Sequence, residues 1–179
     1  MVPKSAVEIL QLVCEGLEIR NIEYMISGSV AFGSYVTPRF TRNFDIVINL
    51  KEEDLNSFLE IFAHDFYLNR DAILVEVKRK GMFNIISDKT GYKLDFLLKK
   101  NDNYRTIKFE RKKRRMVFKF EAWVVSAEDL LLSKLIWIQE IESEIQKNDI
   151  TDLIDDADID REYVNSWIKV LNLKTYNLL

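Results

Sequence analysis

The chain has 179 residues, of which 47% are hydrophobic and 12% aromatic, and a formal net charge of −3. This composition predicts one packed domain, or a domain with a small appendage, and excludes a disordered or low-complexity chain, which would bury too little apolar surface. A single cysteine, Cys14, excludes an internal disulfide. We see no secretory leader and no apolar run of about 18 residues, so we expect a cytoplasmic protein that does not cross a membrane.

The charges are distributed unevenly along the chain. A basic segment, 99–119, carries ten Lys or Arg against two acidic residues, and an acidic segment, 140–162, carries ten Asp or Glu against two basic residues. Such runs are usually solvated surface, which is the first interpretation. The second is that the basic segment contacts a polyanion, while the acidic segment shields it or meets a basic partner. The sequence leaves both interpretations open.

Helical and extended patterns alternate in the first part of the chain. Apolar residues spaced i, i+3 and i+4 over 5–21 predict an amphipathic helix, with Ser5 as its N-cap and Glu8 three residues later. Apolar and β-branched runs predict strands, and small or periodic apolar residues predict helices. We expect strands at 22–27 and 43–50, a short helix at 28–35 and a helix at 51–66.

The later segments continue the mixture and then become helical. The stretch 71–81 is ambiguous between helix and strand, and the helix is favoured. Two extended runs joined by the turn signal "DKTG" predict a hairpin over 82–99, and 114–126 is also extended. Cap-like Ser126 opens a long helix at 126–145, and another helix covers 158–173. The order predicts an α/β part, 1–125, and a helical extension, 126–179, packed on it.

The junction between the first predicted strand and the short helix has the composition of a phosphate-binding turn. Gly28 and Ser29 stand where the strand ends and the helix begins. A helix start offers free backbone N–H groups and a positive dipole end, and glycine allows a ligand to approach the backbone. Many strand-to-helix turns use Gly-Ser only for steric reasons, so this turn alone identifies no site.

Two aspartates interrupt apolar strands. The two-residue period of a strand places Asn43, Asp45, Val47 and Asn49 on one face of 43–50. Asp95 is similarly embedded in "KLDFLL" of the hairpin. A carboxylate in an apolar strand is costly unless it is paired or binds a cation, so the pair indicates either a shared Mg²⁺ or ion pairs with nearby Lys or Arg.

The order of these motifs resembles the nucleotidyltransferase superfamily with the polymerase-beta-like fold. "ISGS", thirteen intervening residues, "NFD" and a later "KLDF" are similar to the family's glycine turn, its Asp-x-Asp strand and its third aspartate. "PRFTRNFDIVI" looks most like bacterial members of the abortive-infection and toxin-antitoxin type. The lysine in "LLLSKLIW" and the pair Asp149 and Asp152 in "NDITDL" are similar to later elements of those relatives. The resemblance implies an α+β fold, a mixed sheet flanked by helices with a C-terminal helical extension.

The resemblance also implies an activity and its residues. It implies transfer of a nucleoside monophosphate from an NTP to a hydroxyl of tRNA, another RNA or a protein, with Mg²⁺ or Mn²⁺ held by Asp45 and Asp95. A cognate toxin or antitoxin protein is the other implied partner. Gly28 and Ser29 would hold the triphosphate. Four cationic residues are candidates to assist them, although for each alone surface charge is the first interpretation, because exposed Lys and Arg are the default: Arg39, Arg42, Lys93 and Lys134.

The sequence departs from the family at Asn43, which stands where the first aspartate of the strand is expected. An amide oxygen can still coordinate Mg²⁺ but brings no charge, so one metal position should weaken. The alternatives are a relaxed one-metal enzyme, a natural loss of catalysis that leaves a protein binding a nucleotide or a partner protein, or an engineered substitution. A purely structural protein is a third alternative, if Asp45 and Asp95 are both ion-paired internally.

The remaining reactive or aromatic side chains predict no second site. His64 is expected at a helix end or on the surface, and with one histidine and one cysteine no zinc set or Ser-His-Asp triad can be assembled. Cys14 lies on the apolar stripe of the first helix and should be in the core. The tryptophans are spaced as packing residues rather than as a platform for bases: Trp123, Trp137 and Trp167.

Overall fold

The computed structural model describes residues 5–38, 41–62 and 66–179. In this part of the chain seven strands form one mixed sheet in the order β3-β4-β5-β2-β1-β7-β6. β2 pairs in parallel with β5 and antiparallel with β1, which itself pairs in parallel with β7. The strands are β1 Tyr24–Ile26, β2 Asn43–Ile48, β3 Phe66–Tyr67, β4 Met82–Ser87, β5 Lys93–Leu98, β6 Lys113–Val117 and β7 Phe120–Val124.

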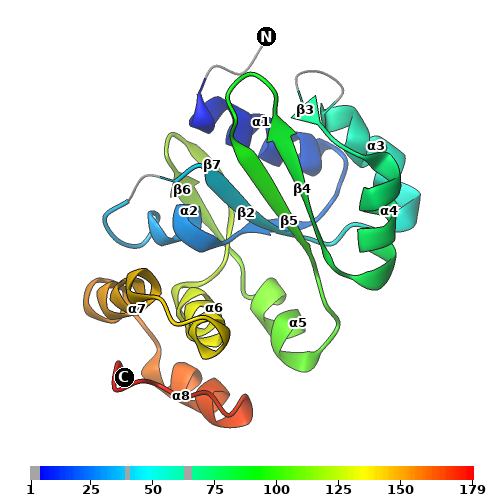
Figure 1. Ribbon diagram of the computed structural model, residues 1–179. Helices are drawn as coiled ribbons and strands as arrows, with labels where there is room; N and C mark the ends of the chain where they lie inside the picture. The colour runs from blue at the N-terminus through cyan, green and yellow to red at the C-terminus, as the bar shows by residue number, and fades with distance from the viewer. Residues whose placement is uncertain (1–4, 39–40, 63–65) are drawn as a thin grey trace.

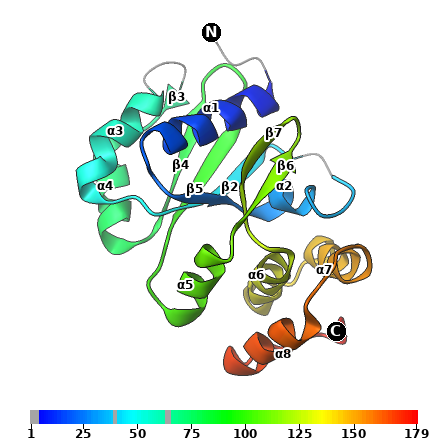
Figure 2. The ribbon, with the colours of Figure 1, turned by 180° about the vertical axis from the view of Figure 1, so that it is seen from behind.

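The helices are divided between the faces and one end of the sheet. Figures 1 and 2 show α1 and α3 on one side, α2 on the other, and α5 to α8 gathered beyond the sheet. The helices are α1 Ala6–Ile19, α2 Gly28–Phe32, α3 Leu55–Leu59, α4 Arg70–Arg79, α5 Asn103–Glu110, α6 Ala127–Glu140, α7 Glu144–Asp156 and α8 Arg161–Val170, with 3-10 turns at Glu52–Asp54 and Glu60–Phe62. None of these helices combines the length and apolar character that a membrane crossing requires.

The core lies between the sheet and the helices on the α1 side. The alternate side chains of β2, Phe44, Ile46 and Ile48, are buried there. Phe96 of β5 stacks on Phe83 of β4 at 5.2 Å between ring centroids, and other rings of α3 and the following turn close over them. The apolar face of the sheet is therefore sealed, and the opposite side chains of β2 and β5 are left for α2 or for a ligand.

Side-chain caps explain where the main helices begin. Ser5 accepts a hydrogen bond from the backbone N–H of Glu8, and Ser126 accepts one from that of Asp129, as the sequence predicts for α1 and α6. Cys14 is buried on α1, and burial raises the pKa of its thiol to about 12. Its predicted place in the core is confirmed, and the thiol stays protonated at neutral pH.

The α+β class, the hairpin over 82–99 and the helical character of 71–81 are confirmed. Three helical segments differ from the prediction. The long helix expected at 126–145 ends at Glu140, and Ser143 caps a separate helix, α7. The helix α5 has no counterpart among the predicted elements. The helix expected at 51–66 is short and framed by 3-10 turns, and 63–65, which include His64, lie outside the described residues.

Candidate functional site

Asp45 and Asp95 lie side by side on the central strands. They are register partners in the parallel pair of β2 and β5, so both side chains leave the same face of the sheet. Neighbouring strands are about 4.8 Å apart, which brings the two carboxylates within reach of one cation. Asp95 is 6% exposed and Asp45 is half-buried, so a ligand reaches them from the Asp45 side.

Gly28 is in direct contact with the Asp45 carboxylate. Gly28 adopts φ +58°, in the left-handed region, and a Cβ atom there would lie 1.9 Å from Asp45 Oδ2. The backbone holds this contact, because the N–H of Ser27 donates to the carbonyl oxygen of Asp45 at 2.8 Å. Glycine is therefore required here for two reasons, its backbone conformation and the space that the carboxylate occupies.

Lys93 partly neutralises Asp95. Its Nζ lies 2.9 Å from Asp95 Oδ1, but the contact lacks hydrogen-bond geometry, and Asp95 Oδ1 accepts no hydrogen bond among the described residues. A buried carboxylate oxygen without a hydrogen bond is suited to a metal ion or to a proton donor of a ligand. A lysine beside it is also what a purely structural pair would show, so the lysine alone does not distinguish these roles.

Asn43 lies on the same face, at the start of β2. Its register partner is Lys93, and it is two residues before Asp45. Asn43 is exposed, and its backbone exchanges two hydrogen bonds with the Thr41 hydroxyl at 3.0 and 3.2 Å. The amide thus occupies the predicted position at the rim of the carboxylate pair. This face of β2 and β5 therefore has one carboxylate fewer than the family pattern has.

The residues present fit a divalent cation with two carboxylates rather than three. Among the described residues no group of three His, Cys, Asp or Glu side chains is placed to hold a metal. Asp45 and Asp95 supply two anionic oxygen donors, and the amide of Asn43 supplies a neutral one on the same face. Mg²⁺ prefers such oxygen ligands and completes its shell with water and substrate phosphates, so the set suits an ion that arrives with a nucleotide.

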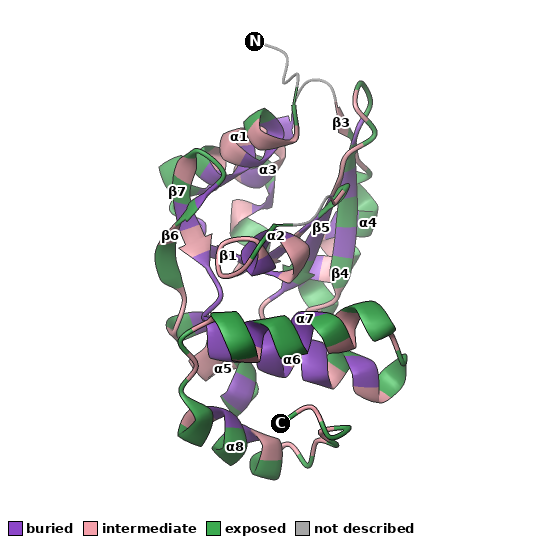
Figure 3. Cartoon of the chain, turned by 90° about the vertical axis from the view of Figure 1, so that its left-hand side faces the viewer, coloured by how far each residue is buried: buried purple, intermediate pink, exposed green. Residues whose placement is uncertain are grey.

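A cleft of about 530 Å³ opens in front of these residues. The glycine turn and β2 form one wall through Gly28, Ser29 and Asp45, and helices α6 and α7 form the other. Figure 3 shows α7 and α6 lying across the end of the sheet beside α2. Gly28 and Ser29 therefore line the same cleft as Asp45, as the sequence predicts.

Lys134 lies on the α6 wall of this cleft. Its Nζ is 2.6 Å from Asp149 Oδ2 and 2.9 Å from Gln146 Oε1, both on α7, and the residue is 4% exposed. The lysine and Asp149 thereby tie α6 to α7, while Asp152 is exposed on the outside of α7. The pair gives the wall a fixed shape next to Ser29.

The sequence predicts that Trp137 packs in the core, and this prediction is wrong. Trp137 is 52% exposed, and it lines the cleft together with Ile145 of α7. The error arises because the periodicity of α6 does not reveal that one of its faces borders a cleft. Of the other predicted residues, Arg42 is exposed immediately before β2, and Arg39 lies outside the described residues.

Several solved structures have a similar arrangement of strands and helices. ANT(2″)-Ia in complex with adenylyl-2″-tobramycin is 10% identical, with 93% of this chain and 96% of that chain covered and a TM-score of 0.61. A Thermotoga maritima protein proposed to be a nucleotidyltransferase is 15% identical, with 96% of each chain covered and a TM-score of 0.53. The lincosamide adenylyltransferase LnuA, bound to lincomycin, is 12% identical, with 82% and 94% covered and a TM-score of 0.50.

The chain has the nucleotidyltransferase fold. The predicted resemblance and fold class are confirmed at this level. No protein-family model matches the sequence, and no curated protein is significantly similar to it. Identities of 10 to 15% show the common fold, and the chemistry of this chain has to be argued from its own residues.

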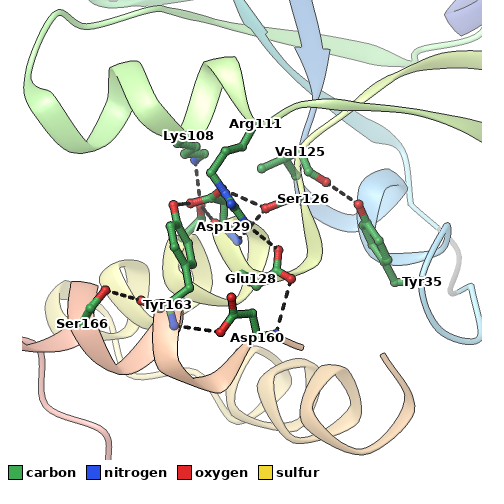
Figure 4. A network of polar contacts seen from close by, with 11 residues as sticks. Tyr35, Lys108, Arg111, Val125, Ser126, Glu128, Asp129, Asp160, Tyr163 and Ser166 are labelled. Carbon is green, nitrogen blue, oxygen red and sulfur yellow. Dashed lines mark hydrogen bonds and ion pairs between the residues drawn. The ribbon is translucent and has the colours of Figure 1, made fainter. Parts of the chain in front are cut away.

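A polar network fixes the outer helices of this nucleotidyltransferase fold (Figure 4). The buried Asp129 of α6 accepts hydrogen bonds from Arg111 at 3.1 Å and from the Tyr163 hydroxyl of α8 at 2.9 Å. Arg111 also reaches Glu128 at 3.1 Å and lies over the Tyr163 ring, 3.9 Å from its centroid. The network joins α5, α6 and α8, and so it positions the walls of the cleft.

Lys108 of α5 is a site residue that the sequence does not indicate. Its Nζ donates to the Ser133 hydroxyl of α6 at 2.7 Å, and it lines the cleft near β5. Burial lowers the pKa of Lys108 to about 8, and the nearby Asp129 carboxylate opposes this shift. The sequence does contain a signal for the helix that carries Lys108. Asp102 is an N-cap residue, and its side chain accepts a hydrogen bond from the backbone N–H of Arg105 at the start of α5.

The basic segment 99–119 does not form one continuous surface. Its second half is largely paired internally: Lys112 lies 3.4 Å from Glu23, and Arg114 forms an ion pair with Glu18. Arg115 donates to the carbonyl oxygen of Ser34 at 2.8 Å. The first half of the segment instead runs along the end of β5 and the face of α5 that borders the cleft.

Proposed function

We propose that this protein binds an NTP with Mg²⁺ or Mn²⁺ in the cleft and transfers the nucleoside monophosphate to a hydroxyl group. The in-register pair of Asp45 and Asp95, with Gly28 closed against Asp45, carries the proposal. This geometry brings together acidic ligands and a backbone turn that can accommodate phosphate, the two requirements of the reaction. The acceptor hydroxyl belongs to RNA or to a protein, as the sequence resemblance implies.

The reaction needs alignment and charge neutralisation more than a covalent intermediate. The acceptor oxygen forms a bond to the α-phosphorus, the bond from that phosphorus to the bridging oxygen breaks, pyrophosphate leaves with the electron pair, and the hydroxyl proton passes to water. Asp45 and Asp95 would hold a divalent ion, which would supply positive charge to the phosphates. Lys93, which is paired with Asp95, and Lys134, which is paired with Asp149, would reach the phosphates by exchanging these partners, and Gly28 and Ser29 hold the triphosphate against β2.

The far wall of the cleft suits the nucleobase. Trp137 and Ile145 present apolar surface opposite the glycine turn. Stacking of a base on an aromatic ring is worth roughly 1–3 kcal/mol and tolerates any base. An NTP that spans from Asp45 to Trp137 would thus have its phosphates at the carboxylates and its base on α6.

A second candidate function rests on Asn43. With one carboxylate fewer, the protein could retain nucleotide binding and have lost transfer, and so act through a partner protein, for instance in a toxin-antitoxin pair. Asn43 is exposed beside Asp45, where its amide oxygen can coordinate a cation but brings no negative charge to the site. The position of Asn43 is therefore compatible with both functions.

Asn43→Asp distinguishes the two functions. Incubation with α-labelled and γ-labelled NTP, Mg²⁺ and total RNA or protein should transfer only the α label. We expect Asn43→Asp to raise the transfer rate by about tenfold or more, the scale on which single changes around a metal act. The matched control is Asn84→Asp, which adds the same charge on β4 at the register partner of Asp95.

An equal increase in both variants would mean that added charge alone is responsible. Transfer by Asn43→Asp only, with none by the natural chain, would support the non-catalytic function. Absence of α-label transfer from every variant would contradict the enzymatic proposal.

A further inference from the structure

A second cavity, of about 310 Å³, adjoins the cleft. The two share Val47, Leu97 and Lys108 in their linings. Val47 follows Asp45 by two residues on β2, and Leu97 follows Asp95 by two residues on β5, so both are on the carboxylate face. Two residues of strand span roughly 6.7 Å. A molecule in this cavity therefore lies next to the proposed metal site, about two strand residues further along the same face of the sheet.

The cavity is lined by cations. Lys99 and Lys100 follow β5, and Arg105 and Lys108 reach it from α5, while none of its described lining residues is acidic. Arg105 forms an ion pair at 3.1 Å with Asp102, which lies outside the lining. Lys99 also lies over the Phe109 ring and Lys108 donates to Ser133, so the described lining carries four cationic residues and no carboxylate beside the aspartate pair. An anionic group is attracted there, and a polycation is repelled.

Apolar side chains lie beside the cations. Met82 at the start of β4 is 54% exposed and its register partner Leu97 is 36% exposed, although both are on the sheet. Both line the cavity, together with Arg105 and Lys108 of α5. Cations next to open apolar surface suit a ligand that joins a phosphate to a less polar ring, because each part then has a partner.

We propose that this cavity is the acceptor site, and that the acceptor carries a phosphate ester close to the hydroxyl that is modified. The inference rests on the proposed function for the identity of the reaction, but the binding site itself does not. A phosphate on Lys99, Lys100 and Arg105, with its ring on Met82 and Leu97, places a neighbouring hydroxyl toward Asp45 and Asp95. The positive charge of the lining disfavours cationic amino sugars as acceptors.

Binding without NTP tests the site independently of the reaction. Calorimetric titrations use the ribonucleotide dimer ApA as a phosphodiester, glucose 6-phosphate as a phosphomonoester, adenosine as a neutral ring and tobramycin as a cation. We expect at least one phosphate ester to bind, and the tighter one identifies the source as nucleic acid or sugar phosphate. Binding of neither ester, or tighter binding of tobramycin, would overturn the proposal.

A pair of charge-matched variants locates the site. The triple change Lys99→Gln, Lys100→Gln and Arg105→Gln should weaken ester binding by about tenfold or more, since charged hydrogen bonds are lost. A control triple removes the same charge from the β6 hairpin: Lys113→Gln, Arg114→Gln and Lys119→Gln. It should change the affinity for the ester by less than about twofold. Equal weakening by both triples would assign the effect to overall charge and overturn the proposal.

Acetylation of the natural chain gives the same information without a variant. The bound ester should protect Lys99 and Lys100 from acetic anhydride, and leave Lys113 and Lys119 reactive, as read by mass spectrometry. Protection of the second pair alone would contradict the assignment. If ester binding and protection are found but no Mg²⁺-dependent NTP binding is, the phosphate-ester site stands, and the proposed transfer and the acceptor role of the site fail.

Discussion

Asp45→Asn and Asp95→Asn should each reduce nucleotidyl transfer by about 100-fold or more. The two carboxylates are the anionic ligands available to a cation on this face of the sheet, and an amide at either position removes charge without removing volume. The effect should be on kcat/KM for the NTP, because the lost interaction bears on the phosphates in the transition state. Initial rates with α-labelled NTP measure it.

Asp71→Asn is the matched control for these two substitutions. Asp71 is on α4, is almost fully exposed and forms only a surface pair with Arg70 at 3.7 Å. We expect transfer within about twofold of the natural chain, because surface pairs contribute little. Retained transfer in Asp45→Asn or Asp95→Asn would show that the carboxylate pair is not the site of reaction.

Gly28→Ala should abolish NTP binding as well as transfer. The added Cβ would lie 1.9 Å from Asp45 Oδ2, so either the turn or the carboxylate must move. An alanine also resists the positive φ of this position, which costs roughly 1–3 kcal/mol. We therefore expect a lower free energy of unfolding, and loss of Mg²⁺-dependent NTP binding at temperatures where the variant is still folded.

Gly91→Ala separates the two effects. Gly91 also has a positive φ, of +69°, but nothing lies within 4 Å of a Cβ added there. The backbone strain is thus similar and the steric collision is absent. Urea unfolding should show destabilisation in both variants, and NTP binding should be lost only in Gly28→Ala. If the two variants bound NTP equally well, the contact between Gly28 and Asp45 would have no functional meaning.

The local elements of the site could be predicted from sequence, because each has a local cause. Alternation in 43–50 assigns Asp45 to the face opposite Phe44, and the turn signal in 88–91 defines the hairpin that carries Asp95. The junction at Gly28 follows from a short apolar strand that ends in Gly-Ser. These features predict the strands that carry the carboxylate pair, while the fold class followed from the order of the motifs and its resemblance to the nucleotidyltransferase superfamily.

The register that joins the two aspartates could not be derived from local patterns. β2 and β5 are far apart in the chain, and a parallel pair leaves no turn that sets its register. The helix α5 escaped prediction because Tyr104 and Phe109 are its only fully buried apolar residues, which is a weak stripe. The separate α7 did have a signal, since Ser143 and Gln146 have the spacing of a capping box.

The exposure of Trp137 and the second cavity depend on tertiary packing. α6 has buried residues on most of its surface, so its sequence resembles that of a core helix. Which side faces a cleft is decided by where α7 and α5 lie, and these positions follow from the Asp129 network and the Lys134–Asp149 pair. The sequence likewise does not separate three cationic residues from the rest of the basic segment 99–119: Lys99, Lys100 and Arg105. They line the second cavity because α5 lies beside the end of β5.

The central claim is that Asp45, Asp95 and the Gly28 turn form a site for a metal-bound nucleoside triphosphate. Calorimetric titration of the natural chain with an ATP analogue that has a methylene group between its α- and β-phosphates, with and without Mg²⁺, tests it most directly. We predict binding that requires Mg²⁺ and disappears in Asp45→Asn. Binding of equal strength without Mg²⁺, or unchanged binding by Asp45→Asn, would contradict the claim.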